Sequence, residues 1–142
     1  MKLIISKEQY NNLFYPVYSA IFVNKEKLMN KYKPVHPNLY YHHSTIEFKP
    51  KLIENLPIGL KIKMKIIGRL TTNKIDVLLV ENKLSGKKHP HITLSTAENI
   101  KPFESDVEIL MNQHKIKKLN DTIIGYVGVF TNQGIINYLK KI

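Results

Sequence analysis

Two short segments of the chain carry the same pair of functional side chains, a histidine and a threonine separated by one residue. The pairs are His43 with Thr45 and His91 with Thr93, and an apolar residue follows each threonine. Successive side chains of an extended strand point to opposite faces, so the histidine and the threonine of each pair share one face. The sequence therefore predicts two amphipathic strands, each presenting one imidazole and one hydroxyl on its polar face.

Two such polar faces, if they meet across one groove, suit the opening of a phosphodiester. The reaction needs a base that takes a proton from water and an acid that gives one to the leaving alkoxide. Histidine serves both purposes because its ordinary pKa is near neutrality. Threonine hydroxyls can donate hydrogen bonds to the non-bridging phosphate oxygens. We predict His43 and His91 as the acid–base pair and Thr45 and Thr93 as the groups that hold the phosphate. This scheme needs no metal ion and no other cofactor, and it leaves open which histidine is the base.

The other histidines near the motifs allow a different interpretation. His89 has the same strand parity as His91 and, with His43 opposite, would complete a three-histidine zinc site. That alternative gives the threonines no role and offers no neighbouring carboxylate to orient the ligands, so we predict no metal site. His42 is adjacent to His43 and is therefore expected to point to the opposite face and to pack there.

Three tyrosines and one lysine are predicted to contact the substrate. Tyr41 falls in the polar row of His43, and Tyr18 and Tyr126 lie in segments that are expected to be strands. Their rings can stack on nucleobases, although aromatic side chains on strands more often belong to a hydrophobic core. Lys88 closely precedes the second motif, where its charge can attract phosphate.

The chain is strongly basic, with 22 lysine and arginine residues against 11 acidic ones and a formal net charge of +11. Such an excess favours a polyanionic partner, and we predict a nucleotide or RNA substrate. Alternation over residues 60–66 places Lys61, Lys63 and Lys65 on one face of a strand, as either an RNA track or an ordinary solvated face. Arg69 is the only arginine, which weakens any case for bidentate recognition of phosphate.

The length of 142 residues predicts a single domain over residues 1–142. No stretch approaches the roughly 18 apolar residues of a membrane span, and the apolar run near the start is too short for a signal peptide. The chain has no cysteine, which excludes disulfides and thiolate metal sites. We expect an intracellular, cytoplasmic protein that has no membrane partner.

Strands and helices are expected to mix along the chain without regular alternation. Strands are predicted over residues 2–5, 17–23, 40–48, 60–66, 75–80, 89–95, 122–130 and 135–139. Helices are predicted over residues 7–14, 25–33 and 105–114, the second capped by Asn24 and the third opened by a capping box at Ser105. Hairpins join several of the strands, so the pattern predicts an α+β fold with largely antiparallel sheet.

The two motifs, their spacing and their flanks resemble the signature of the 2H phosphoesterase superfamily. The flanks at residues 39–42 and 101–105 are similar to the branch that contains the cyclic phosphodiesterase of fungal and plant-type RNA ligases. The resemblance covers roughly residues 17–130. It implies a bilobal α+β fold with a central groove, metal-independent catalysis, and substrates with a 2′,3′-cyclic phosphate or a 2′,5′ linkage. Some viral members of the superfamily open cyclic dinucleotide messengers, which is an alternative substrate class.

One further alternative belongs to a different class of protein. The basic strand face would also suit a non-catalytic RNA-binding module, in which the histidine motifs are simply half-exposed strands. Turnover of cyclic substrates distinguishes the two interpretations, because only the enzyme releases an opened product.

Overall fold

A computed structural model describes residues 16–48, 57–131 and 134–136. Its strands are β1 (Pro16–Val23), β2 (Asn38–Leu39), β3 (His43–Phe48), β4 (Lys61–Thr71), β5 (Ile75–Glu81), β6 (His91–Thr96), β7 (Lys117–Thr131) and β8 (Gly134–Ile136). Its helices are α2 (Lys25–Lys31), α3 (Glu104–Met111) and the 3₁₀ turn η1 (Gln113–Lys115). The strand predicted at 2–5, the helix predicted at 7–14 and residues 137–139 of the last predicted strand lie outside the described residues.

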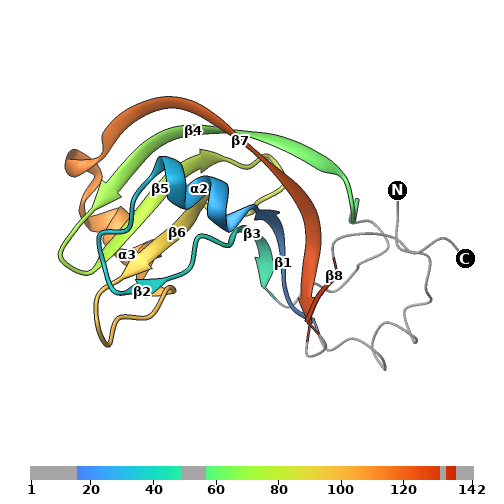
Figure 1. Cartoon of the computed structure of the whole chain (residues 1–142), viewed down its shortest axis with the longest axis horizontal. Coiled ribbons are helices and arrows are strands. Elements are labelled where there is room, and N and C mark those ends of the chain that lie inside the picture. The colour runs from blue at the N-terminus through green and yellow to red at the C-terminus, as the bar shows by residue number, and fades with distance from the viewer. Residues whose placement is uncertain (1–15, 49–56, 132–133, 137–142) are drawn as a thin grey trace, which may run out of the picture.

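Six of these strands form a closed antiparallel barrel. They follow one another in the order β1-β3-β6-β5-β4-β7, and β7 pairs again with β1. β2 extends the sheet beside β6, and β8 pairs with the end of β7. In Figure 1 the long strands β4 and β7 arch together over one side of the molecule, with α2 beneath them. The predicted mixed, largely antiparallel fold with flanking helices is confirmed, but the described strands form this single barrel and do not show two lobes around a central groove.

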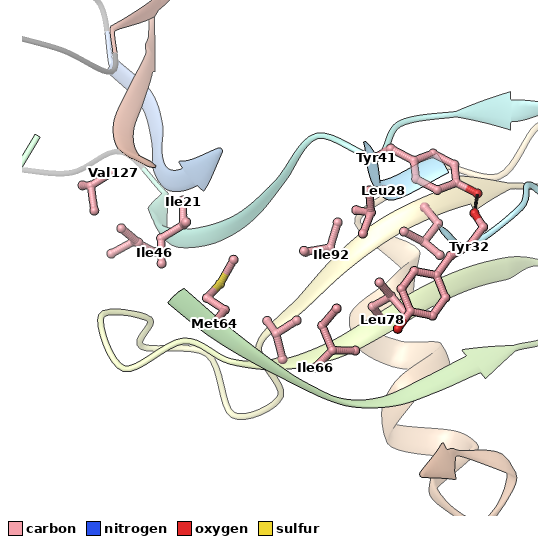
Figure 2. Packing of buried hydrophobic residues seen from close by; sticks show 12 residues of the cluster. Ile21, Leu28, Tyr32, Tyr41, Ile46, Met64, Ile66, Leu78, Ile92 and Val127 are labelled. Atoms are coloured by element: carbon pink, nitrogen blue, oxygen red, sulfur yellow. Dashed lines mark hydrogen bonds between the residues drawn. The ribbon is translucent and has the colours of Figure 1, made fainter. Parts of the chain in front are cut away.

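The interior of the barrel is filled by alternate side chains from all six strands. Figure 2 shows these side chains pointing toward one another: Ile21, Ile46, Met64, Ile66, Leu78, Ile92 and Val127. Leu28 of helix α2 and Tyr32, the C-cap residue of that helix, belong to the same cluster. Burial of each such side chain contributes roughly 1.5–3 kcal/mol. The core therefore holds β3 and β6, the two motif strands, by their inward-facing residues and leaves their outer faces for other contacts.

Helix α3 packs on the outside of the barrel. Its Ile109 contacts a second cluster in which Val77 and Leu79 come from the outer face of β5. The helix begins at Glu104, with Phe103 in the N-cap position, so the predicted capping box at Ser105 is wrong. Ser105 is fully buried inside the first turn, where its hydroxyl contacts a motif residue instead of the helix backbone. The predicted cap of α2 is confirmed.

Strand β7 approaches β1 closely where the barrel closes. A Cβ added to Gly125 would lie 2.5 Å from Cγ2 of Ile21 and 2.7 Å from the carbonyl oxygen of Phe22. Only glycine fits such an approach without displacing the backbone of β1. Closure matters for the site because β1 carries Tyr18 and pairs with β3 on the side away from β6.

Candidate active site

The outer faces of the two motif strands line one cavity of about 540 Å³. All four motif side chains reach it, His43 and Thr45 from β3 and His91 and Thr93 from β6. The rest of the wall comes from β1, α2, β2 and the segment between β2 and β3, the turn before β6, and the start of α3. It comprises Tyr18, Lys25, Leu39, Tyr40, His42, Lys87, Pro102, Phe103 and Asp106. The fold thus brings together two motifs that are 48 residues apart in the chain (91 minus 43).

A bulge in the chain just before β3 shapes the wall of this cavity. Tyr41 donates its backbone N–H to the carbonyl of Thr93 at 3.1 Å, whereas Ser44 already pairs with Ile92. Residues 42–43 therefore have no counterpart on β6. Tyr41 also has a φ of 50°, a left-handed conformation that interrupts the extended chain. Bulges of this kind re-aim side chains, and this one turns two consecutive histidines into the same cavity.

His43 is held through one ring nitrogen. Its Nδ1 lies 2.9 Å from Nδ1 of His42 and 3.4 Å from the hydroxyl of Tyr18, whose ring stacks on it at a centroid distance of 4.5 Å. Burial lowers the pKa of His43 to about 3, and repulsion from His42, His91 and Lys87 acts in the same direction. No hydrogen bond within the described part of the chain engages its Nε2, so this nitrogen is available to a ligand.

His91 is also held through Nδ1. That nitrogen lies 2.9 Å from the carbonyl oxygen of His89, which can only accept, so Nδ1 carries the proton and Nε2 is left for the cavity. A carboxylate oxygen of Asp106 lies 3.9 Å from the same nitrogen. Burial lowers the pKa of His91, but the His89 carbonyl and Asp106 oppose this shift, while Lys87 and His89 add to it. His91 therefore has a partner that stabilises its charged form, which His43 lacks.

Apart from the histidines and the Asp106 carboxylate, the cavity is lined by hydroxyl groups and by cationic side chains. The Thr93 hydroxyl lies 3.1 Å from the Ser105 hydroxyl at the start of α3, and Thr45 is buried in the wall with 8% of its surface exposed. The ammonium group of Lys87 lies 2.8 Å from Asp106, and Lys25 approaches from α2. Hydroxyl donors beside two cationic side chains form an environment that favours a phosphate group.

Of the four residues predicted to contact substrate, only Tyr18 lines the cavity. Tyr41 does not, because its left-handed backbone sends its ring into the core, where it is fully buried and its hydroxyl donates to the Tyr32 carbonyl (Figure 2). Tyr126 lies beside a different hollow, between α2 and β4. Lys88 is exposed outside the cavity wall, and its neighbour Lys87 takes the place at the wall.

Several cavity residues had no sequence signal or were misjudged. His42 was expected to point away from His43, but the bulge places both in the wall. Asp106 and Phe103 reach the site only because α3 docks on β5, which nothing local in the sequence indicates. The bulge itself has a weak local signal, since two successive histidines ahead of an alternating strand break its polar–apolar pattern.

The three-histidine zinc site finds no support in this geometry. Within residues 16–48, 57–131 and 134–136 no group of three or more histidine, aspartate or glutamate side chains is placed to hold a metal ion. His89 contributes its backbone carbonyl to His91 and is not part of the cavity wall. Over the same residues, no helix combines the length and the apolar character needed to span a membrane.

Comparison with protein-family models and with curated proteins finds no match for this chain. The function must therefore be argued from the cavity and from the motif residues that line it.

Proposed function

We propose that this protein is a metal-independent phosphodiesterase that opens a 2′,3′-cyclic phosphate or cleaves a 2′,5′ linkage in a nucleotide or RNA. The observation that carries the proposal is the meeting of both histidine–threonine pairs in one cavity, with each histidine held through Nδ1. Each Nε2 is then free to exchange a proton with a bound substrate. The resemblance to 2H phosphoesterases, drawn from the same four residues, points to the same chemistry.

The reaction needs only groups that the cavity supplies. One histidine takes a proton from water as the water oxygen bonds to phosphorus, and the other gives a proton to the ester oxygen as its bond to phosphorus breaks. The hydroxyls of Thr45 and Thr93 donate to the non-bridging oxygens, where negative charge accumulates. A volume of about 540 Å³ is within the range of small-molecule sites and suits a mononucleotide or the end of an RNA.

The decisive experiment offers the protein a panel of substrates in the presence of a chelator and identifies the products by mass. The panel holds 2′,3′-cyclic mononucleotides, an RNA with a cyclic phosphate end, a 2′,5′-linked dinucleotide and a cyclic dinucleotide. We expect one class to gain the mass of water, and a His43→Ala/His91→Ala double variant to form no product.

Other results of the same panel favour the alternatives. Turnover of the cyclic dinucleotide alone favours the alternative in which the protein hydrolyses cyclic dinucleotide messengers. Turnover that is lost in chelator and restored by zinc favours a metal enzyme. No product from any substrate, together with tight RNA binding, identifies a non-catalytic RNA-binding module.

A further inference from the structure

His42 contacts the ring of His43 in a way that the two-histidine scheme does not use. Their Nδ1 atoms are 2.9 Å apart and their rings are nearly perpendicular, with an interplanar angle of 85°. Phe22 packs edge-to-face against His42 and contacts His43 as well, so both rings are fixed from the β1 side. A separation of 2.9 Å is a hydrogen bond, and one of the two nitrogens must donate while the other accepts.

The lowered pKa values of His42 and His43 favour the neutral form of both rings, so the direction of this bond decides what His43 presents to the cavity. Burial lowers the pKa of both histidines, and repulsion from Lys25 lowers that of His42 further. A neutral imidazole carries one proton. If His42 donates, His43 keeps its proton on Nε2 and faces the cavity as a donor. If His43 donates from Nδ1, its Nε2 faces the cavity as a lone pair.

The groups around His91, on the opposite wall of the cavity, favour the arrangement in which His43 donates from Nδ1 and presents its Nε2 lone pair. His91 has a backbone acceptor at Nδ1 and the Asp106 carboxylate at 3.9 Å, and both stabilise its protonated form. The titratable and charged groups that contact His43 or act on its pKa are Tyr18, His42, His91 and Lys87, and none of them is a carboxylate. A phosphodiester hydrolase needs one proton donor and one proton acceptor. Burial lowers the pKa of both histidines, but only His91 has neighbouring groups that favour its cation, so it is the better suited of the two to take a second proton on Nε2 and to act as the donor. His43 is then left to be the acceptor.

We propose that His42 is a positioning residue whose Nδ1 accepts the Nδ1 proton of His43, fixing the Nε2 lone pair of His43 toward the cavity and making it the base that activates water. His91, beside Asp106, is then the acid that protonates the leaving oxygen. The hydroxyl oxygen of Tyr18, 3.4 Å from Nδ1 of His43, is a weaker second acceptor for the same proton. The assignment of catalytic roles rests on the proposed function, whereas the hydrogen bond and the tautomer do not.

The tautomer can be measured directly by the ¹⁵N chemical shifts of the imidazole nitrogens in the folded protein. We expect His43 to be protonated on Nδ1 and unprotonated on Nε2 near neutral pH. In His42→Ala the acceptor is lost and the Nε2-protonated form of His43 should appear. His42→Asn places an amide oxygen near the position of Nδ1 and should restore the wild-type tautomer. His114→Ala, at an exposed site in η1, is the matched control and helps to assign the spectrum.

Kinetics on the active substrate complete the test. Loss of a group that orients a metal-binding histidine typically costs about 10–100-fold in activity, and an orienting partner of a general base is expected to have an effect of the same order. We expect His42→Ala to lower kcat by that factor with little change in KM, and His42→Asn to recover most of the loss. Thermal melts show whether each variant is folded. If His42→Ala fails to fold, His42→Asn still tests the role of the acceptor.

The outcomes separate the two proposals. An active protein whose His43 carries its proton on Nε2, or whose kcat is unaffected by His42→Ala, overturns the role of His42 alone. An inactive protein with the expected tautomer overturns the phosphodiesterase, and the base role with it, while the hydrogen bond stands.

Discussion

Two regions of this molecule bury ionisable side chains, and they differ in how completely those side chains are hydrogen-bonded. Asp76 on β5 is completely buried, and both of its carboxylate oxygens are bonded. Arg69 donates to them from Nε at 3.0 Å and from Nη2 at 2.7 Å, and the Thr71 hydroxyl donates at 2.7 Å. In the cavity, His43 and His91 are each bonded at Nδ1, and no hydrogen bond within the described residues engages their Nε2.

The difference separates a structural polar group from a functional one. The cost of removing the Asp76 carboxylate from water is offset by its complete set of hydrogen bonds. The cluster of Asp76, Arg69 and Thr71 therefore has a structural role. The histidines are desolvated without full compensation, and their pKa values fall as a result. Half-bonded, titratable groups that line a cavity are the pattern expected of a catalytic site. The single arginine of the chain is committed to the structural cluster, so in the proposed reaction only lysines and hydroxyls would contact the phosphate.

The largest expected effect is on activity in the cavity. His43→Ala and His91→Ala should each lower kcat/KM by about 10²–10⁴-fold, because each removes a general acid or base. The circular dichroism spectrum and the melting temperature should stay close to those of wild type, since neither side chain belongs to the core. Steady-state rates measure the loss, with His114→Ala as the control. A folded His91→Ala protein with near wild-type turnover contradicts the two-histidine mechanism.

The buried carboxylate should show the reverse pattern. Asp76→Ala leaves the Arg69 guanidinium without its partner and is expected to lower the free energy of unfolding by about 3 kcal/mol. We place the value at the low end of the range for buried pairs because the Arg69 side chain is 23% exposed. The fraction that remains folded should retain kcat/KM.

Urea denaturation provides the measurement for this prediction, with an exposed ion pair as control. Lys31→Ala removes one partner of Asp121, which keeps the Tyr32 hydroxyl, and because the Lys31 side chain is 59% exposed the loss should stay below about 1 kcal/mol. Equal losses in the two variants contradict the distinction between the buried cluster and the surface.

The cavity should also leave a signature in the pH dependence of stability. The pKa of His43 is about 3 in the folded protein and near its ordinary 6.5 in the unfolded chain. Between these values the unfolded chain binds more protons, so stability is full above pH 6.5 and falls as the pH drops toward 3. The slope for one proton approaches about 1.4 kcal/mol per pH unit. His43→Asn should lose stability less steeply over this window in urea titrations at a series of pH values, whereas His114→Asn should follow wild type. Identical slopes for wild type and His43→Asn contradict a neutral buried His43.

Regular strands and local caps could be predicted from the sequence because their signals are local. The alternation of β4, with Lys61, Lys63 and Lys65 outward and Met64 and Ile66 inward, appears as predicted. The cap of α2 at Asn24 also appears, where its side chain accepts from the Lys27 N–H at 3.0 Å. In both cases the interactions that determine the structure join residues that are close together in the sequence.

The detailed wall of the cavity could not be predicted, because it depends on exceptions to the same rules. Parity failed at Tyr41, whose left-handed backbone reverses the expected direction of the ring and lets His42 join the site. The prediction of Lys88 rested on its nearness to the second motif, but residues 88–89 form a bend before β6 and Lys87 lines the wall instead. Asp106 depends on the docking of α3 against β5 through Ile109, a contact between distant segments that no local pattern encodes.

The smallest expected effect concerns the lysine face of β4, which lies outside the cavity. Lys61 and Lys63 line a hollow of about 600 Å³ together with Tyr126 and with Lys27 and Lys31 of α2. Helix α2 connects this hollow with the cavity of the two motifs, since Lys25 reaches the wall of that cavity. An RNA whose end occupied the cavity could therefore continue along this face, whereas a mononucleotide could not reach it.

Salt dependence measures how many lysines the substrate engages. Each phosphate neutralised on a single strand adds about 0.7 to the slope of log affinity against log salt, so replacing Lys61, Lys63 and Lys65 by glutamine should flatten the slope for a long RNA by about 2 if all three are engaged. The slope for a small cyclic nucleotide should not change. The matched control replaces the exposed Lys115, Lys117 and Lys118 by glutamine. Each triple variant loses three positive charges, so the formal net charge falls from +11 to +8 in both.

If the two triple variants bind long RNA with equal salt slopes, the effect is one of net charge and not of a track. If wild type shows no steeper slope for RNA than for the small substrate, the lysines are an ordinary solvated face, and a small cyclic nucleotide becomes the better candidate for the natural substrate.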